Sequence, residues 1–145
     1  MGLRRLWSRR WQERHIRDYL EALREADAAA VDRLFTADAT VHSPLYGHTE
    51  ARAFYASLFA DTERSDIELA HIFFGRGADR AAALFRYQWT LRGGHVVAFD
   101  CVDVFRFDPV ARAICELTIV YDTGGASGRS GGAPRQVHRH VVGGA

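Results

Sequence analysis

Apolar residues recur at helical spacing through the first part of the chain. The positions that set this period are Leu3, Trp7, Trp11, Ile16, Tyr19, Leu20 and Leu23. Their spacing predicts one long helix, or two helices joined near Gln12, over about residues 5–25.

Two more helices and a short strand are predicted before residue 60. Asp27 is a suitable N-cap for a second helix that runs to Phe35. Thr49 opens a third helix, whose apolar face includes Phe54 and Tyr55. Between these two helices, residues 39–43 have the composition of a short strand, which Pro44 stops.

The second half of the chain changes to the period of two that is typical of strands. Four runs carry it, at residues 67–73, 81–91, 96–107 and 113–122. Gly93-Gly94 predicts a hairpin with a two-residue turn, because type I′ and II′ turns need positive φ. Three helices with one inserted strand, followed by an antiparallel meander, indicate an α+β domain with its helices against one face of a sheet.

Counting outward from that turn predicts which side chains share a face. It sets Arg86 opposite Cys101, and a four-residue turn at 108–111 then sets Asp103 opposite Glu116. Two carboxylates about 5 Å apart at their Cβ atoms raise the pKa of one partner unless Arg86 compensates. Such a pair suits acid–base chemistry. The alternatives are a solvated pair bridged by Arg86 and a β-bulge that separates the two acids.

The same count makes the opposite face of the sheet apolar as well. It carries Phe85, Tyr87, Trp89, Leu91, Val96, Val102 and Val104. A sheet that is apolar on both sides must be covered on both, so we expect a homodimer through the outer face. The alternative is that the long first helix covers this face.

Composition removes several classes of chemistry. The chain has 145 residues, which is one ordinary domain, and all 19 basic residues are arginine. A lysine Schiff base and lysine-dependent phosphate chemistry are therefore excluded. Cys101 and Cys115 lack CxxC spacing, which indicates core thiols in a reducing compartment. His138 and His140 have no third ligand at usable spacing, so we expect neither a metal nor a cofactor.

Charge divides the chain into three parts. Residues 1–15 form a basic arm or helix extension, residues 16–122 form an acidic domain, and residues 123–145 form a Gly/Ser/Arg-rich tail that we expect to be disordered. The acidic middle argues against a nucleic-acid partner. The sequence lacks a signal peptide and an apolar run of about 18 residues, which predicts a cytoplasmic protein. Packing of the arm by its tryptophans is favoured over contact with an anionic membrane.

Several motifs resemble a known superfamily. They are YLEAL at 19–23, DRLFTADATV at 32–41, Ser43-Pro44 with Gly47, AFY at 53–55 and VDVFRF at 102–107. Over Ile16 to Asp122 the chain resembles the nuclear-transport-factor-2-like superfamily, in particular its SnoaL-like polyketide cyclase and ketosteroid isomerase branches. The resemblance implies a cone-shaped fold of three N-terminal helices packed on a curved, mainly antiparallel sheet.

The resemblance also implies roles for individual residues. Tyr19 and Asp103 fall on the pair that forms an oxyanion hole in ketosteroid isomerases. The position of the proton-transferring base falls on Ser43, and a serine hydroxyl is no base at neutral pH without an activating neighbour. His42 is the nearest substitute, although in a strand it points away from Ser43. Glu116 is a further candidate for the proton shuttle.

A small-molecule pocket is therefore expected. Its candidate catalytic residues are Tyr19, Asp103, Glu116 and His42, and its candidate substrate-binding residues are Ser43, Arg86, Phe99, Thr118, Val120 and Phe54. The first hypothesis is a cofactor-free isomerase or cyclase that moves a proton on an apolar carbonyl compound of steroid or polyketide type. The alternatives are a binding or accessory protein without turnover, and an epoxide-hydrolase-like enzyme using Asp103, Arg86 and Glu116.

Overall fold

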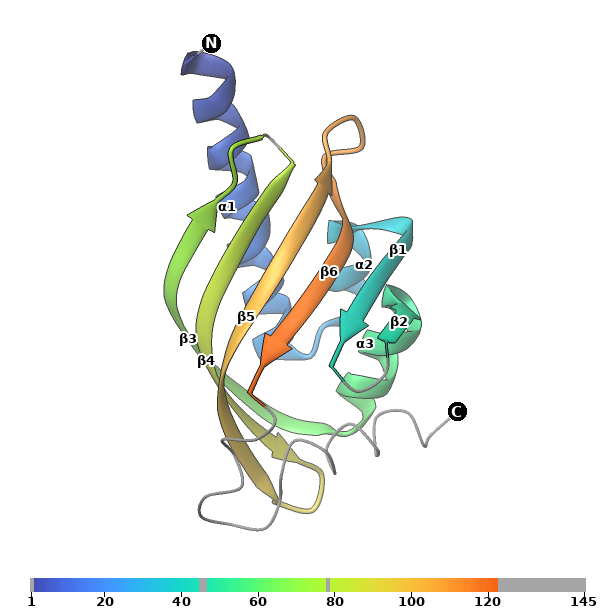
Figure 1. Ribbon diagram of the computed structural model, residues 1–145. Coiled ribbons are helices and arrows are strands. Elements are labelled where there is room, and N and C mark those ends of the chain that lie inside the picture. Colours follow the sequence, from blue (N-terminus) through green and yellow to red (C-terminus); the bar gives the residue numbers. More distant parts are fainter. Residues whose placement is uncertain (1, 45–46, 78, 123–145) are drawn as a thin grey trace.

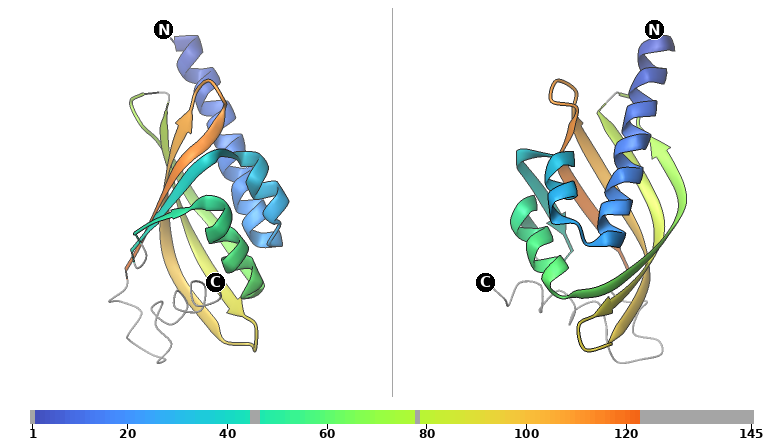
Figure 2. Two further views of the ribbon diagram at one scale, coloured as in Figure 1. Left: turned by 90° about the vertical axis from the view of Figure 1, so that its right-hand side faces the viewer. Right: turned by 180° about the vertical axis from the view of Figure 1, so that it is seen from behind.

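A computed structural model describes residues 2–44, 47–77 and 79–122. The elements in chain order are α1 (Gly2–Glu25), α2 (Ala28–Leu34), β1 (Phe35–Ser43), β2 (Gly47–Glu50), α3 (Ala51–Ala60), β3 (Thr62–Phe74), β4 (Arg80–Leu91), β5 (Val96–Asp108) and β6 (Ala113–Tyr121). All three helices lie on one face of a curved sheet (Figures 1 and 2). The predicted α+β fold is confirmed.

The first helix is continuous, and its upper end projects beyond the sheet (Figure 1). Gln12 is buried within it, so the helix is not broken there. Trp11 packs edge-on against Phe107, with ring centroids 5.1 Å apart. The next helix begins where expected, because Asp27 Oδ1 accepts a hydrogen bond from the Ala30 N–H at 3.0 Å.

The sheet has six strands in the order β2-β1-β6-β5-β4-β3. All neighbouring pairs are antiparallel except β1 and β6, which run parallel. β1 begins at Phe35 rather than at Ala39, and the short strand β2 was not predicted. Its residues include Thr49, where the sequence pattern predicted the start of a helix, and α3 begins two residues later at Ala51.

The β4–β5 hairpin differs from the predicted one by a single loop residue. The Leu91 N–H donates to the His95 carbonyl at 2.8 Å, so the loop contains residues 92–94. Gly93 and Gly94 have φ angles of 97° and 91°, which explains why both positions are glycine. The two-residue turn prediction is therefore wrong, although the hairpin itself is confirmed.

This extra loop residue changes which side chains share a face. Phe85 lies opposite Cys101, and Arg86 lies opposite Asp100. Because side chains alternate along a strand, the shift by one residue moves Arg86 to the outer face, away from the helices. The inward face of β4 instead carries Phe85, Tyr87 and Trp89, which the sequence count had placed on the outer face.

A second irregularity separates the two acids that were predicted to pair. The register between β5 and β6 shifts between Arg106 and Phe107. The β5–β6 loop also contains residues 109–112 rather than the predicted 108–111, because Asp108 pairs with Ala113. Together the two differences place Asp103 opposite Ile119 and Glu116 opposite Arg106. The predicted Asp103–Glu116 pair is wrong, and the β-bulge alternative describes the sheet correctly.

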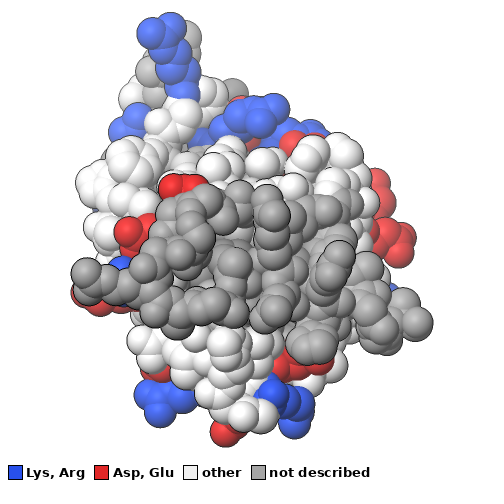
Figure 3. All heavy atoms as spheres, turned by 60° about the horizontal axis from the view of Figure 1, so that its bottom comes forward, with Lys and Arg blue, Asp and Glu red and all other residues white. Residues whose placement is uncertain are grey.

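Charged side chains lie mainly on the outside of the domain. Figure 3 shows arginines at the free end of α1 and along the upper rim, whereas acids and further arginines are scattered around the rest of the rim. The space between the helices and the sheet is filled mostly by aromatic and aliphatic side chains. Asp103, on β5, is a carboxylate with only 2% of its surface exposed in this core.

Candidate functional site

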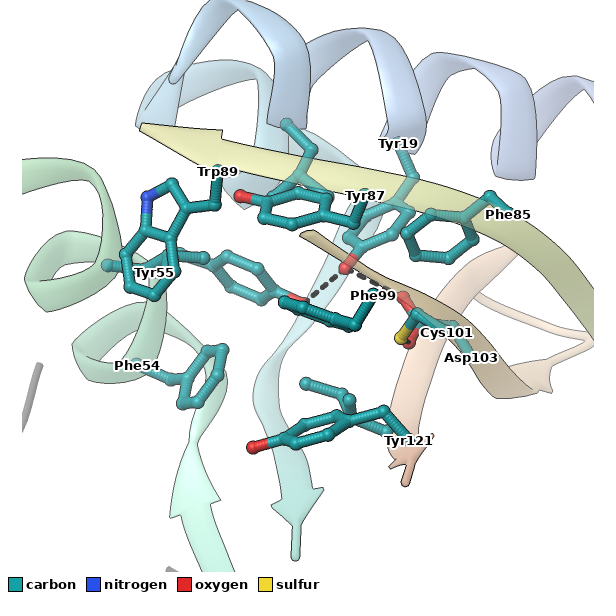
Figure 4. A pocket seen from close by; sticks show the side chains of 13 residues that line it. Tyr19, Phe54, Tyr55, Phe85, Tyr87, Trp89, Phe99, Cys101, Asp103 and Tyr121 are labelled. Atoms are coloured by element: carbon teal, nitrogen blue, oxygen red, sulfur yellow. Dashed lines mark hydrogen bonds between the residues drawn. The ribbon is translucent and has the colours of Figure 1, made fainter. Parts of the chain in front are cut away.

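A pocket lies between the helices and the inward face of the sheet (Figure 4). Its lining residues are Tyr19, Leu23, Phe54, Tyr55, Leu58, Phe85, Tyr87, Trp89, Phe99, Cys101, Asp103, Ile119 and Tyr121. The cavity volume is about 60 Å³, and all the empty space of the pocket, open solvent at its mouth included, amounts to about 520 Å³. A mostly apolar wall with a few polar groups is typical of a site for a small molecule.

Asp103 is the one carboxylate in this described lining. It lies on the inward side of β5, where two groups donate hydrogen bonds to it. The Tyr19 hydroxyl donates to Oδ2 at 3.2 Å, and the Cys101 thiol donates to Oδ1 at 3.3 Å. Each carboxylate oxygen therefore has one donor, from a helix on one side and from the same strand on the other.

Tyr19 joins Asp103 to a second tyrosine. The hydroxyls of Tyr19 and Tyr55 are 2.7 Å apart, so a chain of hydrogen bonds connects α3, α1 and β5 (Figure 4). Tyr19 is fixed by edge-on packing against Phe105, with ring centroids 5.3 Å apart. A rigid aromatic framework thus holds the three oxygen-bearing side chains in place. We call Tyr19, Tyr55 and Asp103 the hydroxyl–acid cluster.

Burial changes the proton affinity of Asp103. Loss of contact with water raises its pKa to about 7, although the hydrogen bonds from Cys101 and Tyr19 act in the opposite direction. No arginine lies in the described lining to stabilise the ionised form. Near neutral pH the carboxyl group is therefore able to hold a proton or release it, which is what proton transfer requires.

The neighbouring groups stay protonated. Burial raises the pKa of both Tyr19 and Tyr55 well above the ordinary value, and the nearby Asp103 raises both further. Burial also raises the pKa of Tyr87 and of the Cys101 thiol. The hydroxyls and the thiol therefore serve as neutral hydrogen-bond donors, and Asp103 is the group in the cluster that titrates near neutral pH.

Four of the residues singled out from the sequence meet at this pocket. Tyr19 and Phe54 come from helices, and Phe99 and Asp103 come from β5. Arg86 and Glu116 do not reach it. Arg86 pairs with Asp100 on the outer face at 3.6 Å, and Glu116 pairs there with Arg106 at 3.5 Å. The Asp103, Arg86 and Glu116 arrangement of an epoxide hydrolase is thus contradicted, because a sheet separates Asp103 from the other two.

Thr118 and Val120 also lie outside the pocket. They pair with Val104 and Val102 in the outer rows of the sheet, and Val120 is 50% exposed. Their inward neighbours on β6, Ile119 and Tyr121, line the pocket in their place. The error has the same cause as the wrong acid pair, since one residue of register exchanges the two faces.

His42 and Ser43 lie on opposite sides of β1. His42 is exposed, and its Nδ1 lies 3.2 Å from Nε2 of His48 on β2. Ser43 is buried, but the described pocket lining does not include it. The predicted opposition of these two side chains is confirmed, and His42 is too far outside to act as the pocket base.

The sequence count missed most of the aromatic wall. Tyr55 was assigned only to the apolar face of the third helix, and Tyr87 and Trp89 were placed on the wrong face. Tyr121 was not considered. The spacing of Phe85, Tyr87 and Trp89 at alternate positions indicated correctly that all three share one face, but it does not tell which face meets the helices.

The described part of the chain holds neither a cluster of three or more metal-binding side chains nor a helix that could span a membrane. Residues 2–44, 47–77 and 79–122 contain no group of three or more His, Cys, Asp or Glu side chains placed to hold a metal ion. Across those same ranges, no helix is long and apolar enough to cross a membrane. His138, His140 and the predicted disordered tail lie outside the described residues.

Fold and pocket together define the class of protein. Residues 16–116 match the family of SnoaL-like domains, so the chain belongs to that family. This confirms the resemblance drawn from the motifs. No protein with a curated function matches the sequence.

Several solved structures have the same fold as this chain. One is the epoxide hydrolase/cyclase-like enzyme SalBIII of pyran ring formation in salinomycin, with 21% identity, a TM-score of 0.66, and coverage of 79% of this chain and 92% of that one. Another is a putative SnoaL-like polyketide cyclase from Shewanella denitrificans, with 20% identity, a TM-score of 0.63, and 76% and 89% coverage. A third, from Catenulispora acidiphila, has a ketosteroid isomerase-like fold and contains trimethylamine, with 16% identity, a TM-score of 0.64, and 74% and 85% coverage. At these identities the likeness concerns the fold.

Proposed function

We propose that this protein binds a small apolar carbonyl compound and transfers a proton on it without a cofactor, as an isomerase or a cyclase does. The observation that carries the proposal is Asp103, a buried carboxyl group with a pKa of about 7 at the wall of an aromatic pocket. The pocket-forming SnoaL-like fold supports it. It is further supported by the similar structure of a putative SnoaL-like polyketide cyclase, because a cyclase is one of the two enzyme types proposed here.

The hydroxyl–acid cluster contains groups suited to both steps of the reaction, the removal of a proton from the substrate and its return. Ionised Asp103 removes a proton from the carbon next to the substrate carbonyl. Once Asp103 is protonated it no longer needs the hydrogen bond from Tyr19, so the Tyr19 hydroxyl is able to donate to the enolate oxygen. Asp103 then returns the proton to another carbon, or to the oxygen of a second carbonyl group that the enolate carbon has attacked. No electrons are lost or gained, and no cofactor is consumed.

Ligand binding without turnover is the second candidate function. It is favoured by the placement of Ser43, Glu116 and His42, because none of these three contributes a second proton carrier to the described lining. A carrier protein and an enzyme with one proton carrier have the same pocket. They differ in whether deuterium from solvent enters the carbon next to the carbonyl of a bound ketone.

Proton counting in the cluster gives a direct test of the proposal. When Asp103 is ionised, the Tyr19 hydroxyl donates its hydrogen bond to Asp103, and the Tyr55 hydroxyl donates its hydrogen bond to Tyr19. A ligand that only accepts hydrogen bonds, such as 2-acetylnaphthalene, then finds no free donor. We expect its affinity to fall by up to about tenfold per pH unit above pH 7. 2-Naphthol, which also donates, is expected to lose much less.

The binding of both ligands is measured from pH 5 to pH 9 by the quenching of Trp89 emission, because Trp89 lines the pocket. In Asp103→Asn the affinity for 2-acetylnaphthalene is expected to be independent of pH. Asp100→Asn, on the outer face, serves as the matched control and keeps the wild-type profile. An unchanged profile in Asp103→Asn, or no saturable binding in the wild type, contradicts the proposal.

The outer face of the sheet supports a second proposal, that the protein is a homodimer. Leu84, Val102 and Val120 form one row across three strands, and a neighbouring row contains Ala82, Val104 and Thr118. The pairs Arg86–Asp100 and Arg106–Glu116 flank these rows on opposite sides. A second copy related by a two-fold axis covers the apolar rows and brings base against acid at both margins.

Val120→Arg is expected to convert the dimer to a monomer, because a charge replaces a half-exposed apolar side chain in one of these rows. Val110→Arg is the matched control, since Val110 is 93% exposed in the β5–β6 turn, away from these rows. Light scattering after gel filtration measures the mass of each variant. A wild type that is monomeric at micromolar concentration, or a dimer in Val120→Arg, rules out this interface.

A further inference from the structure

Two histidines touch on the outer face of the sheet. His42 on β1 and His48 on β2 are directly opposite each other in the antiparallel register of the two strands. Both are exposed, whereas Val41 and Ser43, on either side of His42, are buried. Nδ1 of His42 lies 3.2 Å from Nε2 of His48, and the ring centroids are 4.4 Å apart. The two strands thus hold two imidazole nitrogens side by side at the surface.

The separation of these nitrogens matches what a metal ion with two imidazole ligands requires. Zinc binds an imidazole nitrogen at about 2.0–2.1 Å. Two such nitrogens are about 3.3 Å apart at a tetrahedral ion, and about 2.9 Å apart at neighbouring positions of an octahedral ion. The observed 3.2 Å lies between these two values. Because both rings are exposed, a small rotation of each about χ2 points both lone pairs at one ion.

The backbone already brings the two rings together. β1 is paired on both sides at this position, because His42 lies opposite His48 on β2 and opposite Thr118 on β6. Binding of an ion therefore orders two side chains and requires no change in strand pairing. Two ligands that are held side by side in this way bind one ion jointly and far more tightly than either does alone.

The neighbours of the pair do not repel a cation. Thr118 lies in the same row of the sheet, and the next row contains Thr40 with Glu50 and Glu116 on either side. Arg106, one strand further, is paired with Glu116. Imidazole nitrogen favours Zn²⁺, Cu²⁺ and Ni²⁺, whereas Mg²⁺ and Ca²⁺ prefer oxygen ligands. The pair therefore suits a divalent transition metal.

From this geometry we infer a surface site for one divalent transition-metal ion, bound by Nδ1 of His42 and Nε2 of His48, with water at its other positions. The ion joins the short edge strand β2 to β1 and so stabilises that edge of the sheet. The site is independent of the reaction proposed above, because Asp103 lies on the inward face of the sheet.

The sequence pattern could not indicate this site. The expectation of no metal considered His138 and His140 alone. Strand β2 was not predicted, and without it nothing in the pattern brings His42 and His48 together.

Calorimetric titration of Zn²⁺ into the metal-free full chain tests the site. The full chain carries His138→Asn and His140→Asn in every sample, so that the second histidine pair of the sequence does not contribute. We expect one ion per chain. His42→Asn and His48→Asn are each expected to weaken binding by about 100-fold, because one imidazole then remains. His71→Asn is the matched control, since it removes another exposed histidine from the sheet and should leave the affinity unchanged.

Thermal unfolding of the same samples gives a second measurement. Saturating Zn²⁺ is expected to raise the melting temperature when the pair is intact, because the ion binds the folded arrangement of the two strands. His42→Asn is expected to lose this increase. Mg²⁺ at the same concentration is expected to have no effect in any sample.

Several results would overturn the inference. One is the absence of saturable Zn²⁺ binding while the pair is intact, and another is equal affinity before and after His42→Asn. A loss of affinity in only one of His42→Asn and His48→Asn would do the same, because the ion then has a single imidazole ligand from the pair. These results leave the proposed function untouched, since ketone binding near Asp103 is expected to be the same in all of these variants.

Discussion

Asp103→Asn will raise the melting temperature much more at pH 8.5 than at pH 5. Burial raises the pKa of Asp103 in the folded protein to about 7. The unfolded chain has the ordinary value of about 3.9. Between these two values the folded protein holds a proton that the unfolded chain releases, so the stabilising effect of that proton is lost as the pH rises toward 7.

The size of the effect follows from the difference between the two pKa values. About 3 units correspond to a limit of about 4 kcal/mol in the free energy of unfolding, all of it lost above pH 7. Asparagine is neutral at every pH and escapes this loss. For a domain of this size the gain in melting temperature at pH 8.5 is on the order of 10 °C.

Thermal unfolding of wild type and Asp103→Asn at both pH values measures this gain. Asp100→Asn is the control, because its side chain is 72% exposed on the outer face and its replacement should have little effect at either pH. An equal shift of Asp103→Asn at pH 5 and pH 8.5 would show that the carboxyl group does not titrate between the two conditions. A loss of stability confined to pH 8.5 would show that the ionised form is stabilised after all.

Tyr19→Phe will weaken the binding of 2-acetylnaphthalene by at least about tenfold at pH 6. The change removes the hydroxyl that lies 2.7 Å from Tyr55 and 3.2 Å from Asp103, so the ligand oxygen loses a donor. It also removes one of the hydrogen bonds that lower the pKa of Asp103, so that pKa rises further. The pH at which ketone binding declines should therefore move upward.

The titration used for the wild type measures both effects. Tyr87→Phe is the matched control, because the Tyr87 hydroxyl is bound to Ser65 outside the hydroxyl–acid cluster. Tyr55→Phe should lie between the two, since it leaves Tyr19 in place but removes its neighbour. Equal affinities in Tyr19→Phe and Tyr87→Phe would mean that the ligand does not use the Tyr19 hydroxyl.

Element types were predictable from the sequence because they depend on local periodicity. The helical recurrence up to Leu23 and the alternation in residues 81–91 each determine an element without knowledge of its neighbours. The register was not predictable, because it depends on single residues in loops and bulges. The loop at 92–94 has one residue more than predicted, and for this reason the sequence count placed Arg86 on the wrong side of the sheet.

The candidate site was predictable in part for the same reason. Tyr19 and Asp103 were assigned from motifs that resemble a family. This assignment does not depend on the register count, so the error in register did not affect it. The hydroxyl of Tyr55 was hidden in a helix pattern that records only that the residue is apolar. Its contact with Tyr19 joins residues on two helices, and a spacing rule within one element does not reveal such contacts.

The ionisation of Asp103 is the central claim, and carbon-13 NMR of its side-chain carboxyl group tests it most directly. The resonance is assigned by its absence from Asp103→Asn and followed from pH 4 to pH 9. A midpoint near pH 7 is the expected result, because burial outweighs the two hydrogen bonds that the carboxylate accepts. A midpoint near pH 4 would show a carboxylate that is fully ionised at neutral pH, and would contradict the claim that burial raises the pKa of Asp103 to about 7.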